Sequence, residues 1–155
     1  MLKKQEFFLD EVELKIKSAI DEEEKHFKRF FSACEKLKTS FPFNEKTLED
    51  EEKVEHLDQM TWRFIKIQDS MGRRLIPYVV EYNFDTIDGL TFRDMLNKLE
   101  KLELLNSQEW NIFRVLRNDI THVYPDDDKL LETLNEVYLK KDLLYTIYKN
   151  LRNSI

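Results

Sequence analysis

Apolar residues recur every three or four positions along most of this chain, which is the spacing of one face of an α-helix. The first such stretch, residues 7–37, contains no proline or glycine, and the first proline is Pro42. It predicts one long helix, or two helices that meet in a bend around residues 21–24. The first loop is predicted at residues 40–44.

A second long helix is predicted to begin between Thr47 and Glu52 and to run through Val79. Gly72 and Pro77 interrupt its pattern. Because proline lacks a backbone N–H and its ring crowds the preceding turn, a bend is expected near Pro77. The first half of the chain therefore predicts two long helices joined by a short loop.

Three further helices are predicted in the second half of the chain. Thr91 and Ser107 are the expected N-caps of two of them, and the second of these covers residues 108–123. The last helix is expected to begin at the acidic residues 126–128, whose charge suits the positive end of a helix dipole, and to run through Leu151.

The composition supports the same architecture. The 155 residues include only two glycines and three prolines, whereas a sheet protein needs turn residues every few positions. Charged residues make up 36% of the chain and hydrophobic residues 41%, which suits a bundle with a charged exterior. We therefore expect an all-α fold, an antiparallel bundle of about five helices, in which residues 1–155 form a single domain.

Charge and cysteine content limit the possible functions. The formal net charge of −6 is unfavourable for sequence-independent binding to long nucleic acid, so any RNA site must be a local positive pocket or be built from two chains. Cys34 is the only cysteine, which fits a reducing compartment. The sequence contains neither a secretory signal pattern nor a run of eighteen apolar residues. We expect a cytoplasmic protein without membrane contact.

The fourth predicted helix carries the pattern R-N-x-x-x-H-x-Y-P over residues 117–125. Because Pro125 disfavours helical geometry at Tyr124, His122 should fall in the last turn. One face of this helix is apolar, namely Trp110, Phe113, Leu116, Ile120 and Val123. The opposite face holds no lysine or glutamate and consists of Asn111, Arg114, Asn118, Thr121 and His122. Such a face is typical of one covered by a partner or a ligand.

Arg117 and His122 offer the chemistry needed to handle a phosphodiester without a metal. A guanidinium binds phosphate through a fork of N–H groups, and an imidazole transfers protons near neutral pH. The two residues are five positions apart, about 140° around an ideal helix, so they should flank a groove rather than stack. A two-fold partner could bring a second copy of each residue opposite the first.

This pattern resembles the R-x-x-x-x-H signature of the HEPN superfamily. In its longer form, R-N-x-x-x-H-x-Y, it is similar to the HepT-type toxins encoded beside minimal nucleotidyltransferase antitoxins. The resemblance covers about nine residues, together with the all-α plan and the position of the pattern just before the last helix. It implies a metal-independent endoribonuclease that acts as a homodimer and requires no cofactor.

The resemblance also implies roles for individual residues. Arg117 would hold the scissile phosphate, His122 would act as general acid and base, and Asn118 would orient His122 or the phosphate. Tyr124 matches the tyrosine that the nucleotidyltransferase partner modifies with AMP. The aspartates at 126–128, directly after the pattern, would repel RNA and favour a narrow substrate such as a tRNA end, with mRNA as a further possibility.

Other residues give weaker signals. Further RNA contacts are expected from Arg114, Thr121, Arg73 and Arg74. His26 belongs to a single E-x-x-H pair, whereas a di-iron bundle needs two such pairs and further carboxylates, so no metal site is expected. Two alternatives stay open: a non-catalytic nucleotide- or substrate-binding subunit that partners a nucleotidyltransferase, and a helical interaction protein in which the pattern is coincidental.

Overall fold

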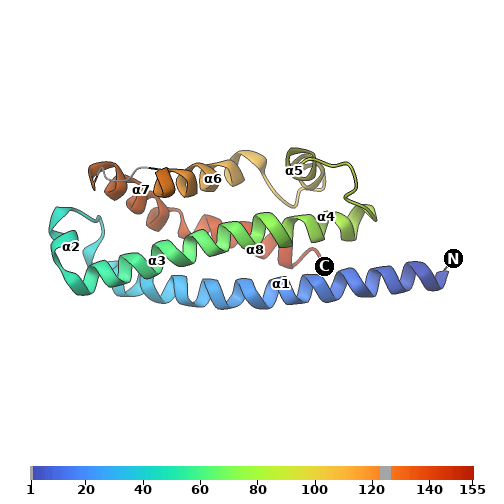
Figure 1. Ribbon diagram of the computed structural model, residues 1–155, viewed down its shortest axis with the longest axis horizontal. Coiled ribbons are helices and arrows are strands. Elements are labelled where there is room, and N and C mark those ends of the chain that lie inside the picture. The colour runs from blue at the N-terminus through green and yellow to red at the C-terminus, as the bar shows by residue number, and fades with distance from the viewer. Residues whose placement is uncertain (1, 123–126) are drawn as a thin grey trace.

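A computed structural model of the chain describes residues 2–122 and 127–155, with side chains from residue 10 onward. All regular structure in these ranges is helical, which confirms the predicted all-α class. Figure 1 shows two long helical layers running side by side, with the remaining helices packed along them. Residues 123–126, where the fourth and final predicted helices were expected to end and begin, lie outside the described residues.

The first long stretch forms one helix, α1, which spans Leu2–Leu37 and continues into a short 3-10 turn at Lys38–Ser40. The alternative with two helices and a bend around residues 21–24 is therefore wrong. Ala19 and Phe27 on either side of this polar segment are both buried, so the same face of the helix stays in the core throughout.

The second long helix is divided into several segments. A short helix, α2 at Glu45–Glu49, is capped by Asn44, and α3 follows at Glu51–Ser70. The pattern of this helix was expected to be interrupted at Gly72 and Pro77. The structure has a π-helical turn there, η2 at Met71–Leu75, and α4 follows at Ile76–Phe84. Pro77, which has no backbone N–H to donate, lies in the first turn of α4, directly after this π-helical turn. The ribbon runs on there without a sharp break (Figure 1).

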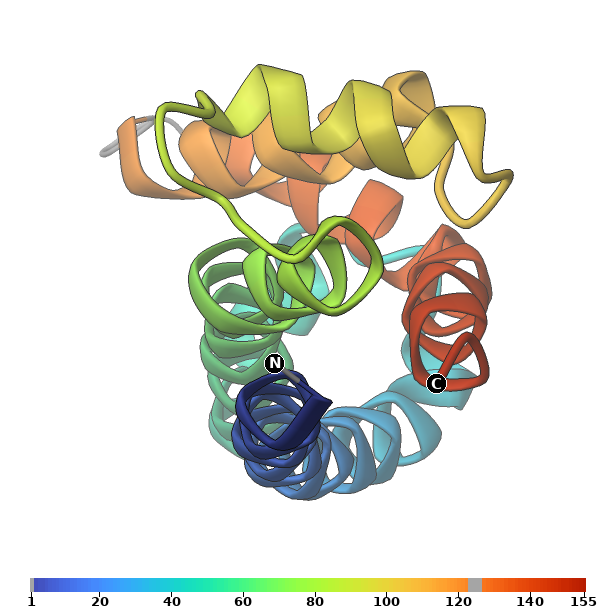
Figure 2. The ribbon, with the colours of Figure 1, turned by 90° about the vertical axis from the view of Figure 1, so that its right-hand side faces the viewer.

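Helices α5 (Phe92–Lys101) and α6 (Ser107–His122) lie on one side of the long helices (Figure 2). Thr91 is the N-cap of α5, as predicted, in a capping box with Asp94. The N-cap of α6 is different from the prediction. The Asn106 side chain accepts from the backbone N–H of Glu109 at 3.0 Å, while the Ser107 hydroxyl donates to Glu100. Comparison of Figures 1 and 2 shows that α5 runs across the long axis, whereas α6 runs along it.

The predicted single final helix is wrong. It is divided at Lys140 into α7 (Asp127–Leu139) and α8 (Lys141–Arg152). The break allows the two halves to bury their apolar faces in different places. Helix α7 packs against α6, whereas Tyr148 of α8 stacks near Phe27 of α1, with ring centroids 4.9 Å apart. A straight helix could not reach both neighbours. Because of this break, the structure has more helices than the five that the sequence predicted.

The buried apolar side chains form one continuous cluster that connects all the long helices. Its largest fully buried members include Phe30 of α1, Phe64 of α3, Phe113 of α6 and Tyr148 of α8. Within the described residues, no helix is long and apolar enough to span a membrane.

Candidate functional site

A surface hollow lies beside α6, where this helix meets α5 and the end of α3 with η2. It is an open cleft of about 880 Å³. The side of α6 that faces it is the polar face that the sequence analysis distinguished from the apolar stripe. Trp110, Phe113 and Leu116 of that stripe are buried, as predicted, so packing of the stripe against the bundle presents the polar face to the cleft.

The cleft is strongly basic although the chain is acidic. Its lining contains one acidic residue, Asp69, and four arginines, namely Arg73, Arg93, Arg114 and Arg117, which gives a formal charge of +3 against −6 for the chain. The other polar side chains are neutral: Gln68, Asn97, Ser107, Gln108, Asn111 and Asn118. The lining contains no lysine. This is the local positive pocket that the net charge requires of any RNA-binding site.

Arg117 is held in place by Asp69 of α3. Its Nε donates to Oδ1 of Asp69 at 3.1 Å and its Nη2 donates to Oδ2 at 3.3 Å. Both side chains are 27% exposed. A carboxylate that accepts two N–H groups fixes the plane of the guanidinium, while the remaining N–H donors stay available. Arg117 therefore enters the cleft in a defined orientation.

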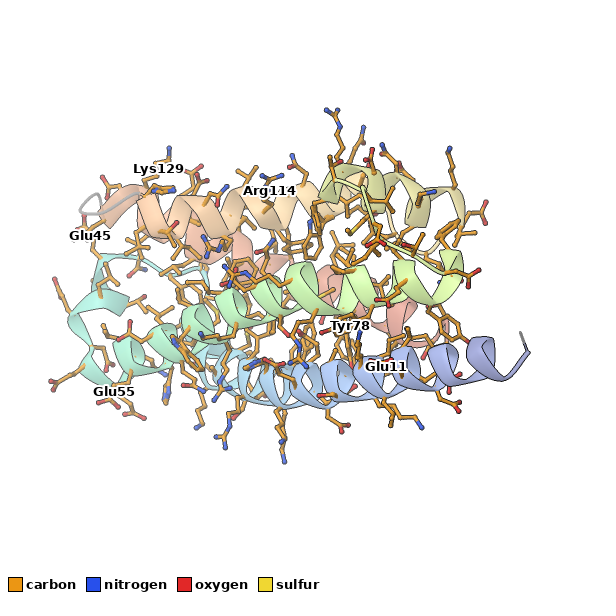
Figure 3. All side chains as sticks on the ribbon, turned by 45° about the vertical axis from the view of Figure 1, so that its right-hand side comes forward. Glu11, Glu45, Glu55, Tyr78, Arg114 and Lys129 are labelled. Carbon is orange, nitrogen blue, oxygen red and sulfur yellow. The ribbon has the colours of Figure 1, made fainter. Side chains whose placement is uncertain are left out.

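The other three arginines of the cleft are free to bind a ligand. Arg73, Arg93 and Arg114 are exposed, and no hydrogen bond or salt bridge ties their guanidinium groups to the part of the chain that the structure describes. They come from three different elements, η2, α5 and α6. Figure 3 shows Arg114 on the side of α6 that points away from α1 and α3.

The floor of the cleft is apolar. Trp110 is 1% exposed and its ring lies 6.3 Å from that of Phe92. Gly72 lies beside them: a Cβ atom at this position would meet Cζ2 of Trp110 at 3.5 Å. A Cβ at Gly72 would thus lie in ordinary van der Waals contact with the indole, so Gly72 packs directly beside the floor of the cleft.

His122 lies beyond the cleft. It is exposed in the last turn of α6 and does not line the hollow. Asn118, which does line it, is one helical turn earlier on the same side. Thr121 does not line the cleft either, and its hydroxyl donates to the backbone carbonyls of Asn118 at 3.0 Å and Arg117 at 3.3 Å. One chain therefore places Arg117 and Asn118 in the cleft and His122 past its end.

Two further predicted residues stand apart from this site. Arg74 points to α1, where it forms a salt bridge with Glu22 and donates to the Ser18 hydroxyl at 3.3 Å, so it does not share the cleft with Arg73. Tyr124, the expected modification site, lies outside the described residues.

Sequence reasoning missed Arg93 and Asp69. Arg93 follows the N-cap Thr91 by two residues, a position at which a solvated arginine is common, so no local signal distinguishes it. Asp69 comes four residues before Arg73 on the same helical run, and this spacing alone could have suggested that the two face the same region.

His26 is paired with other side chains and Cys34 is buried. His26 accepts at Nδ1 from Arg63 at 2.9 Å and lies 3.5 Å from Glu22. Burial raises the pKa of the Cys34 thiol to about 12, so this cysteine is packed and unreactive at neutral pH. Among residues 10–122 and 127–155, no three histidine, cysteine or carboxylate side chains converge as a metal site would require.

No family model, curated protein or solved structure matches this chain significantly. The proposal of a function therefore rests on the cleft and on α6, the helix that contains Arg117 and His122.

Proposed function

We propose that the chain is a metal-independent endoribonuclease of the HEPN type, the toxin of a toxin–antitoxin pair. The observation that carries this proposal is the cleft: Arg117 is held in a fixed orientation among three arginines that pair with no described residue, and His122 follows one turn beyond Asn118. A phosphodiester is the ligand that suits guanidinium forks, and imidazole is the proton carrier that its cleavage requires.

The chemistry would proceed by attack of the ribose 2′-hydroxyl on the adjacent phosphorus. His122 accepts the proton of the 2′-hydroxyl, and the guanidinium of Arg117 stabilises the negative charge that develops on the phosphate oxygens. The bond from phosphorus to the 5′-oxygen breaks, and that oxygen is protonated by an imidazolium. The products are a 2′,3′-cyclic phosphate and a free 5′-hydroxyl.

A homodimer would complete this site, because Arg117 and His122 diverge within one chain. Helix α6 carries two exposed apolar residues, Ile112 at 37% and Val115 at 47% exposure. Both lie at helical spacing from His122, on the side away from the core. An interface that covers this side would bring the His122 end of one chain towards the same end of its partner.

The resemblance adds a second partner. A minimal nucleotidyltransferase antitoxin would attach AMP to Tyr124, two residues after His122, and so place a bulky anion beside the reacting groups. Both the RNA substrate and such an antitoxin place the protein in the cytoplasm.

A non-catalytic role is the second candidate, and one observation favours it. The guanidinium of Arg117 is paired with Asp69 and His122 lies outside the cleft, so a single chain has a basic cleft without the imidazole that the cleavage mechanism uses. Such a chain could present a substrate to a nucleotidyltransferase without cleaving it. The two candidates differ in one property, which is whether the phosphodiester bond is broken.

Incubation of the purified chain with end-labelled RNA in excess EDTA tests the proposal. Cleavage to 2′,3′-cyclic phosphate ends is expected for the wild type and not for His122→Ala or Arg117→Ala. The side chains of Arg117 and Asp69 are both partly exposed to solvent. Their salt bridge therefore contributes at most about 1 kcal/mol to the free energy of unfolding, and Arg117→Ala should fold.

His56→Ala is the matched control, because His56 lies on α3, contacts Glu52 and does not line the cleft. Cleavage that needs added magnesium, or that survives His122→Ala, would rule out this mechanism. Binding without cleavage would favour the non-catalytic role.

A further inference from the structure

We propose that the cleft is the binding site for a segment of single-stranded RNA, held by Arg73 and Arg93 outside the motif and by Arg114 within its helix. This assignment rests on the ribonuclease function proposed above and names how that enzyme would hold its substrate. Arg93 of α5, which has no part in the R-N-x-x-x-H-x-Y pattern, is its most specific element.

The first support is the arrangement of the free charges. Arg73, Arg93 and Arg114 approach the same hollow from η2, α5 and α6, and each has an unpaired guanidinium within the described part of the chain. Three like charges on one open surface repel each other unless counterions or a polyanion neutralise them. A nucleic-acid backbone supplies a row of phosphates and releases the counterions on binding.

The neutral lining favours a single strand over a duplex. Asn97, Gln108, Asn111 and Asn118 offer paired donor and acceptor groups between the arginines. Amides of this kind bind the Watson–Crick edges of bases, which are accessible only where the bases are unpaired. The cleft is open to solvent rather than enclosed, so it can admit a strand that continues beyond it at both ends.

The path of the strand follows from the register of α6. Arg114, Asn118 and His122 occur at intervals of four residues, so they form one row along the helix. Each interval advances the row by about 6 Å. A strand that leaves the cleft along this row passes Arg114 and Asn118 and then reaches His122. The cleft therefore holds the nucleotides that flank the scissile phosphate, and His122 acts at its exit.

Fluorescence anisotropy with a labelled single-stranded RNA of twelve nucleotides tests this inference. The His122→Ala chain in EDTA serves as the background, so that binding is measured without cleavage. Arg93→Ala and Arg73→Ala are each expected to weaken binding about three- to tenfold and to reduce the slope of log Kd against log salt by about 0.7. Arg29→Ala, an exposed arginine of α1 outside the cleft, is the matched control and should change neither value.

Competition distinguishes the form of the ligand. A duplex of the same sequence and AMP alone are each expected to compete at least tenfold more weakly than the unlabelled single strand. The inference is overturned if Arg93→Ala and Arg29→Ala have equal effects, or if AMP competes as well as the strand, which would indicate a mononucleotide pocket. All variants should keep thermal unfolding within a few degrees of the parent, since these arginines are exposed.

The same measurements separate this inference from the ribonuclease proposal. If the wild type cleaves RNA and Arg93→Ala alters neither binding nor cleavage, the cleft assignment fails and the ribonuclease stands. If the strand binds through Arg93 and the wild type cleaves nothing, the cleft assignment stands and the ribonuclease fails.

Discussion

Arg117 of α6 is bound by Asp69 of α3 through two parallel hydrogen bonds, at 3.1 and 3.3 Å, across the edge of the cleft. The pair has two opposed consequences. It fixes the orientation of the guanidinium, and it also places the only acidic side chain among the described residues of the cleft lining against the charge that a phosphate would need. A substitution of Asp69 alone should therefore change the orientation of Arg117 and the attraction of the cleft for a phosphate in opposite senses.

Asp69→Asn should raise the affinity for RNA and lower the rate of cleavage. The substitution increases the formal charge of the lining by one, which we expect to tighten single-stranded RNA binding about threefold at low salt. It also removes the charge that orients Arg117, so cleavage should slow about tenfold or more. Anisotropy and single-turnover cleavage measure the two effects. Asp58→Asn, on the exposed side of α3, is the control, and a loss of affinity in Asp69→Asn would contradict the prediction.

Val115→Glu should dissociate the proposed homodimer. Val115 is 47% exposed on the His122 side of α6, and a buried carboxylate on each chain would oppose its copy across a two-fold axis. Light scattering at tens of micromolar should show a dimer for the wild type and a monomer for the variant, with cleavage lost. Leu14→Glu alters an apolar residue of α1 that is 66% exposed, and it should leave the dimer intact. A monomeric wild type would refute the shared site.

The stability of the fold should decrease as the pH rises from about 5 to about 8. Burial raises the pKa of Glu23 from its ordinary value of 4.5 to about 8, with a smaller increase from Glu22, while Ser70 and Arg74 lower it. Glu23 is 0% exposed and its carboxyl oxygens form no hydrogen bond of normal geometry within the described residues. The folded chain therefore keeps this proton more tightly than the unfolded chain, and stability is lost as the pH approaches the folded-state pKa.

Glu23→Gln tests this dependence directly. The amide cannot ionise, so the variant should be more stable than the wild type by about 2–4 kcal/mol above pH 8 and nearly equal to it at pH 4.5. Urea unfolding across this range measures the difference. Glu55→Gln, whose side chain lies on the exterior of α3 (Figure 3), should show no such trend.

Tyr124→Phe should escape control by the antitoxin and keep most of its toxicity. The prediction comes from the sequence pattern, in which this tyrosine follows His122 by two residues. Co-expression with a cognate nucleotidyltransferase, followed by mass spectrometry, should find the mass of AMP on the Tyr124 peptide of the wild type. An adduct on Tyr138 or Tyr145 instead would disprove the switch and leave the ribonuclease proposal intact.

Much of the local structure could be predicted from the chain because it depends on neighbours in sequence. Apolar residues at a period of 3.6 and the shortage of glycine and proline predict long helices. Thr91 acts as an N-cap through atoms three residues away, and Trp110 and Phe113 fall on the buried side of α6 because the period of the helix puts them there. The break at Lys140 escaped prediction, since it has no local signal and follows from two different packing partners.

Spacing along the chain was enough to predict the all-α class, the buried stripe of α6 and the row that joins Arg114, Asn118 and His122, whereas the number of helices and the points where they break depended on packing. Only the tertiary structure decided which side chains share the cleft. Arg73, Arg93 and Asp69 share the cleft lining with Arg117 although they lie twenty or more residues away in the sequence, because α5 packs against α4 and α6. Periodicity specifies which side of a helix is buried but not which helix covers it. The set of charged side chains that face each other across the cleft therefore depends on how the helices pack.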